Sequence, residues 1–111
     1  MIEPIPLSLL IHSCTVVTEK KDSWGDKTQE TTTTLQKIRI DETKVEYISD
    51  KQNKKEKCDA VLYFDCRNSL PSGFTFKIDS RVIFDGTDYS IKSIKRYNTN
   101  KPHHYEVRLS L

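Results

Sequence analysis

The sequence predicts an all-β fold, a small single-domain β-barrel of about six antiparallel strands. Apolar and polar residues alternate with a period of two along most of the chain, which is typical of half-buried strands. All three glycines fall between these runs, where turns are needed. No apolar stripe at helical spacing is longer than two turns, and 111 residues amount to one domain, 1–111. The same features suit a β-barrel or a sandwich. Closing the sheet into a barrel would remove its exposed edges.

The chain is expected to begin with an extended arm, residues 1–8. Pro4 and Pro6 lie in this segment, and proline fixes its own backbone while disfavouring helix at the residue before it. The first strand is expected over 9–18, where apolar residues dominate. The longest uncharged apolar run lies in the same region, but it is too short and too polar to span a bilayer, and no signal peptide is predicted.

A second strand is expected over 31–40. It opens with four consecutive threonines, whose β-branched side chains favour extended backbone. Ile38 and Ile40 are expected to face the core, with Lys37 and Arg39 on the outer face, because successive side chains of a strand point to opposite sides.

The segment 44–57 is expected to be a long, mobile, exposed loop. Its apolar residues are confined to Val45, Tyr47 and Ile48, and it is very polar from Ser49 onward. A loop of this length in a compact domain is usually functional or disordered. A central strand covered on both faces is expected next, over 58–66, because it contains a continuous apolar run too short for a typical helix.

A β-hairpin is predicted from the two segments 81–84 and 89–94. Asp85-Gly86 between them suits a tight primed turn, because both residue types tolerate a positive φ. If Thr87 and Asp88 belong to the connection, the loop is longer and bulged. The apolar phase shifts within the second segment, and a bulge near 92–93 would restore burial there.

The last strand carries the clearest alternation in the chain. Apolar residues occupy every second position at Tyr105, Val107, Leu109 and Leu111, between polar ones. One face of this strand should therefore be buried and the other wet.

Charge is unevenly divided along the chain. Residues 1–50 have 6 basic and 9 acidic side chains, whereas residues 51–111 have 12 and 7. The two halves thus carry net charges of −3 and +5. One surface could face a negative partner and another a positive one, although ordinary solvated charge explains the pattern as well.

No catalytic or cofactor-binding constellation is predicted. The three cysteines lack a CxxC spacing and are expected to be free thiols that pack as small apolar residues. His103 and His104 are adjacent, so a strand would point them to opposite faces, and no metal site is expected. We expect no enzyme and no cofactor, since no nucleophile, zinc or phosphate-loop motif is present.

Two features leave a binding role open. Basic residues Lys92, Lys95, Arg96 and Lys101 alternate with tyrosines at positions 89, 97 and 105, as on the single-strand-binding platform of OB-folds. Two of these tyrosines share phase with apolar neighbours, which favours inward packing instead. Trp24 lies in a polar turn; anchoring in the core is the favoured interpretation, and contact with a partner is the alternative.

Several segments, in order along nearly the whole chain, resemble one family. They are PLSLLIH at 6–12, DSWGD at 22–26, KIRID at 37–41, AVLYF at 60–64, RVIFDGTDYSI at 81–91 and HHYEV at 103–107. The set resembles the small minor capsid proteins of phages and prophages of Gram-positive hosts, which are related to head-completion, or stopper, proteins of long-tailed phages.

The resemblance implies a head-tail connector, a non-enzymatic ring subunit in the virion neck, assembled in the host cytoplasm. Its expected partners are portal and adaptor proteins, tail proteins and further copies of itself, with no membrane contact. The segment 49–57 would be the channel loop. Its lysines Lys51, Lys54, Lys55 and Lys57 would form a positive collar in non-specific contact with packaged DNA.

The remaining expectations concern contacts and alternative roles. Pro4 and Pro6 would stiffen an N-terminal arm that docks on a neighbour, and Trp24 is a candidate partner contact. A tail terminator or other neck component with the same barrel is one alternative. A free OB-like module that binds single-stranded nucleic acid is the other.

Overall fold

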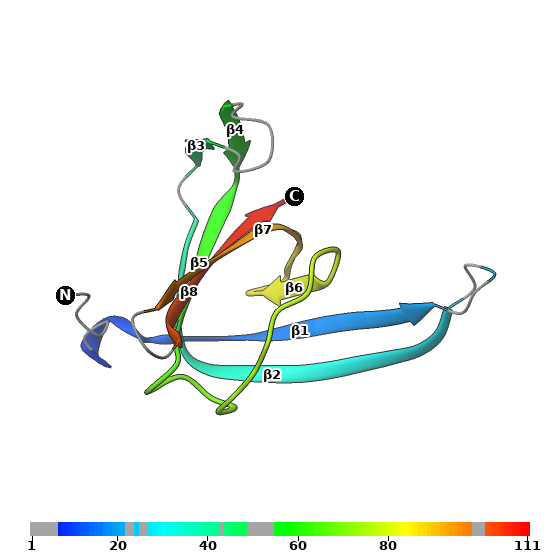
Figure 1. Cartoon of the computed structure of the whole chain (residues 1–111), viewed down its shortest axis with the longest axis horizontal. Coiled ribbons are helices and arrows are strands. Elements are labelled where there is room, and N and C mark those ends of the chain that lie inside the picture. The colour runs from blue at the N-terminus through cyan, green and yellow to red at the C-terminus, as the bar shows by residue number, and fades with distance from the viewer. Residues whose placement is uncertain (1–6, 22–23, 25–26, 43, 49–54, 99–101) are drawn as a thin grey trace.

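The computed structural model describes residues 7–21, 24, 27–42, 44–48, 55–98 and 102–111. Six antiparallel strands form a closed barrel in the order β1-β2-β5-β8-β7-β6 (Figure 1). These strands are β1 (His12–Lys21), β2 (Lys27–Asp41), β5 (Ala60–Asp65), β6 (Arg81–Phe84), β7 (Thr87–Asn98) and β8 (Pro102–Ser110). A separate two-stranded sheet consists of β3 (Val45–Ile48) and β4 (Lys55–Cys58). The predicted fold class, a small all-β barrel of about six strands, is confirmed.

The core fills the inside of the barrel with alternate residues of its strands. Leu62 and Phe64 of β5 point inward beside Val107 and Leu109 of β8, and each is almost fully buried. The register of β5 against β8 places residue 62 opposite 107 and residue 60 opposite 109. Ile38 and Ile40 are buried as predicted. Lys37, just before them, is exposed, and Arg39, between them, is half-buried.

Two phenylalanines outside any strand extend the core of the barrel. Phe74 and Phe76, in the connection between β5 and β6, pack against the barrel core. The Phe76 ring stands edge-on to Phe64 and to Tyr105, with centroids 5.6 and 5.8 Å apart. The sequence analysis did not assign this segment, although Phe74, Phe76 and Ile78 alternate with polar residues.

The β6–β7 hairpin has the tight two-residue turn predicted from Asp85-Gly86. Phe84 pairs with Thr87, and Asp85 and Gly86 have φ values of 49° and 79°. Two consecutive positive φ values are those of a type I′ turn, whose twist matches that of the strands. The predicted bulge in β7 is also present, as a register shift between Ile91 and Ser93.

Two expectations at the ends of the chain differ from the structure. Leu7 and Ser8, expected in the extended arm, begin a 3-10 helix at Leu7–Leu9. Pro4 and Pro6 lie outside the described residues. Leu111, expected on the buried face, is 75% exposed, because β8 ends at Ser110 and the last residue extends past the barrel. In the described part of the chain, no helix is long and apolar enough to cross a membrane.

The prediction of a single long loop over 44–57 is wrong for its described residues. Strands β3 and β4 pair from Val45↔Cys58 to Ile48↔Lys55. Lys57 and Glu46 are exposed, so part of this small sheet faces solvent. Its sequence therefore lacks the sustained apolar alternation from which a strand is predicted. The predicted central strand 58–66 is accordingly divided: β4 ends at Cys58, and β5 begins at Ala60.

Candidate assembly surfaces

The β1–β2 hairpin continues past the barrel as a two-stranded arm. β1 pairs with β6 only from Thr15 to Val17, whereas its ladder with β2 extends to Lys21↔Lys27. Figure 1 shows the two strands running side by side well beyond the others. Glu19 and Glu30, paired across the arm, are both exposed. A two-stranded ribbon is marginally stable alone, so contact with another protein would stabilise this arm.

Trp24 lies in the turn that joins the two strands of this arm. Its side chain is 86% exposed, so the favoured interpretation of a core anchor is wrong. The reason is the length of the strands. They carry the turn past the end of the barrel, where the buried core residues are out of reach. The expectation of a partner contact at Trp24 stays a prediction.

The β3–β4 hairpin is the second projecting element (Figure 1). Lys57 and Glu46 are cross-strand neighbours whose charged atoms lie 3.8 Å apart, with exposed side chains. Such an exposed pair contributes little to stability. Lys55 is likewise exposed, at the far end of β4. Lys51 and Lys54 lie outside the described residues. The two described members of the predicted lysine set are therefore both accessible from solvent.

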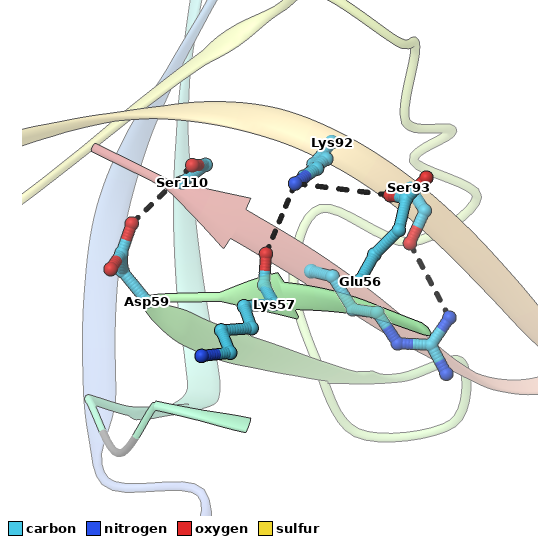
Figure 2. Close-up of polar contacts among 7 residues, drawn as sticks. Glu56, Lys57, Asp59, Lys92, Ser93 and Ser110 are labelled. Carbon is cyan, nitrogen blue, oxygen red and sulfur yellow. Dashed lines mark hydrogen bonds and ion pairs between the residues drawn. The ribbon is translucent and has the colours of Figure 1, made fainter. Parts of the chain in front are cut away.

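The base of the β3–β4 hairpin is fastened to the barrel (Figure 2). From β7, the Lys92 ammonium donates a hydrogen bond of 3.1 Å to the carbonyl oxygen of Lys57 and lies 3.8 Å from the Glu56 carboxylate. Asp59, just after β4, accepts hydrogen bonds of 3.3 Å from the Ser110 hydroxyl and 2.8 Å from the backbone N–H of Leu111. These bonds reach β7 and the end of β8, so they orient the hairpin on the barrel.

The basic and aromatic residues of β7 and β8 form no stacking platform in their described part. Tyr89 is buried and donates a 2.6 Å hydrogen bond to Glu42, and burial together with this bond raises its pKa to about 12. Tyr105 packs against the core, with the Arg96 guanidinium 6.0 Å from its ring centroid. Two of the three tyrosines thus point inward, as their phase indicates.

The histidine pair departs from expectation. The Nδ1 atoms of His103 and His104 lie 2.9 Å apart, and the rings meet edge-on with centroids 5.1 Å apart. Alternation in a strand fixes only the direction of the Cα–Cβ bond, and rotation about the side-chain bonds brings these rings together. No group of three or more metal-ligating side chains occurs among the described residues.

The three cysteines are free thiols, as predicted. Cys14 and Cys58 are buried, and Cys66 is half-buried. Burial raises the pKa of Cys14 to about 12, which keeps it a neutral thiol. A protonated thiol is a poor nucleophile, so Cys14 acts as a small apolar residue of the core.

A closed barrel with two projecting hairpins defines a class of small all-β proteins in which the exposed hairpins are the surfaces for assembly. Within that class, the chain belongs to the minor capsid protein family, whose model matches residues 6–109. No curated protein matches the sequence. Among solved structures, the chain is similar to protein xkdH of the phage-like element PBSX from Bacillus subtilis, with 15% identity, a TM-score of 0.47 and coverage of 89% of this chain and 91% of that one. Membership of this family makes the protein a structural component of a virion.

Proposed function

We propose that this minor capsid protein is a head-tail connector of the head-completion type. In this role, copies of the chain form a ring in the virion neck, below the portal and adaptor proteins. The ring closes the DNA exit channel and presents a docking surface to the tail. The proposal follows from the family and from the two hairpins that leave the barrel.

The observation that carries the proposal is the anchored β3–β4 hairpin with its exposed lysines. Bonds from Lys92 and to Asp59 hold its base, so every copy in a ring would present the hairpin in the same orientation. Lys55 and Lys57 are exposed on it, and the sequence adds Lys51 and Lys54 between its strands. Repeated around a ring, these lysines would form a positive collar that attracts DNA phosphates without sequence preference.

A free OB-like module has less support. Binding to single-stranded nucleic acid requires aromatic faces on which bases can stack. Tyr89 is in the core and Tyr105 packs against it, so neither offers such a face. The place of assembly distinguishes a connector from a tail terminator with the same barrel. A tail terminator would be found on tails that are made without heads.

The proposal is tested in virions that carry Lys55→Gln and Lys57→Gln together. We expect heads that are filled but lose DNA, with fewer attached tails, because the positive collar is weakened. The matched control is Lys37→Gln with Lys77→Gln, two exposed lysines away from the β3–β4 hairpin. DNA retention and tail attachment are scored by electron microscopy and by DNA content. If the double variant retained DNA and attached tails as well as the control does, the role of the hairpin in closing the channel would be contradicted.

A further inference from the structure

Trp24 is the one tryptophan of the sequence, and it stands at the end of the β1–β2 arm. Its side chain is 86% exposed, the highest value among the large apolar residues described as exposed. Tryptophan is enriched among the residues that dominate binding energy at protein interfaces. An indole held out at the end of a two-stranded arm has the form of a knob that inserts into another protein.

A hollow of about 570 Å³ lies at the opposite end of the same hairpin, where β1 begins and β2 ends. Most of its lining is polar, and Ile11, which is 67% exposed, and the half-buried Phe84 contribute to a smaller apolar wall. Its rim carries the carboxylates of Glu42 and Asp85. The volume falls within the range of about 300–1,000 Å³ that is typical of pockets for small ligands.

The two ends of the hairpin are complementary in chemistry. The indole ring matches the apolar wall, and its N–H is a donor that suits a rim carboxylate. In the sequence, the segment 20–27 that contains Trp24 has three lysines and two aspartates, a net charge of +1. The rim carboxylates are negative, so the electrostatic attraction favours this approach.

We propose that Trp24 of one copy seats in the Ile11–Phe84 hollow of a second copy. Knob and hollow lie at opposite ends of one paired hairpin, in a molecule whose longest extent is 45 Å, so a single chain cannot join them. We infer a head-to-tail contact, which repeats from copy to copy and forms a ring where the rotation between neighbours closes. The proposal rests on the ring arrangement of the proposed connector and names the contact that would build it.

Because the sequence has one tryptophan, its emission reports directly on Trp24. We expect the emission of the purified chain to shift to shorter wavelength as concentration rises, while sedimentation shows the average mass at least doubling. Trp24→Ala and Ile11→Arg should each remain monomeric at the same concentrations. Ile78→Arg, at another exposed apolar position, is the control that should still assemble. Ser13→Arg is a second hollow variant, at an exposed lining residue, should Ile11→Arg fail to fold.

Mixing the two variants gives the sharpest test. The Ile11→Arg chain keeps its knob and the Trp24→Ala chain keeps its hollow, so the mixture should form one-to-one pairs that grow no further. Emission that is unchanged up to the solubility limit would overturn the proposal, as would a shift that persists in both hollow variants or a mixture that forms no pairs. Each of these results leaves the connector role open, because that role is measured by DNA retention in virions.

Discussion

The Nδ1 atoms of His103 and His104 lie 2.9 Å apart at the start of β8, although the two residues are neighbours in the chain. At this distance one imidazole must donate a proton that the other accepts. Two imidazolium ions could not occupy this geometry, since each would present only donors. The folded protein therefore favours a state in which at least one of the two rings is neutral.

This pair predicts that the protein loses stability in mild acid. Burial, and next the charge of His103, lower the pKa of His104, while Glu106 and Asp65 act in the opposite direction. The folded pKa then lies below the unfolded one, about 6.5, so the unfolded chain binds protons more readily. The stabilisation is present above that pH and is lost as the pH falls from it through the lower folded pKa of His104.

The measurement is the thermal midpoint between pH 8 and pH 5, compared with His104→Gln. The variant should show a weaker dependence on pH in this interval. An identical slope in both proteins would mean that groups other than the histidine pair cause the acid sensitivity.

A second prediction concerns the cluster of aromatic rings around Phe64. Phe64 is 1% exposed and contacts Phe74, Phe76 and Tyr105. Phe64→Ala should lower the free energy of unfolding by about 3–5 kcal/mol, the range for a large core side chain that leaves a cavity. Urea unfolding gives this value directly. Ile78→Ala, at a half-exposed position, is the control and should stay within about 0.5 kcal/mol of the parent. A small loss for Phe64→Ala would show that the cluster is loosely packed.

A third prediction concerns the bond that fastens the β3–β4 hairpin to β7. In Lys92→Met the aliphatic stem is kept, but the donor to the Lys57 carbonyl and the charge beside Glu56 are removed. Amide hydrogen exchange in β4 should accelerate, while exchange in β5 and β8 stays as in the parent. Lys77→Met, an exposed lysine in the β5–β6 connection, is the matched control. Equal acceleration throughout the barrel would mean that Lys92 supports the whole fold.

Strands that bury one face could be predicted from the sequence. Alternation in β8 and the phase shift at residues 92–93 of β7 are local signals of burial, and both matched the structure. The β1–β2 arm and the β3–β4 hairpin carry no such signal. Because their residues are exposed, no buried face selects apolar side chains at every second position. For this reason the sequence predicts an end of the first strand at Thr18 and a start of the second at Thr31, both too close to the barrel. The same error leads to the prediction that Trp24 is anchored in the core.

Features that depend on side-chain torsions and long-range packing could not be predicted from the sequence either. The meeting of the two histidine rings depends on rotations that no periodicity encodes. The partial burial of Phe74 and Phe76 depends on how the β5–β6 connection packs against the barrel core. The Ile11–Phe84 hollow joins residues more than seventy positions apart, which only the closure of the sheet brings together.

The last prediction concerns the type I′ turn at Asp85-Gly86. Gly86 has a φ of 79°, and a Cβ atom added there would meet no atom within 4 Å. Gly86→Ala should therefore cost about 1–2 kcal/mol of unfolding free energy from the left-handed backbone alone, with no steric clash. Gly86→Asn should cost less, because asparagine tolerates this conformation better than alanine. Thermal or urea unfolding of the two variants tests the order. If alanine proved as stable as asparagine, the turn would have changed type, and the register Phe84↔Thr87 would have to be revised.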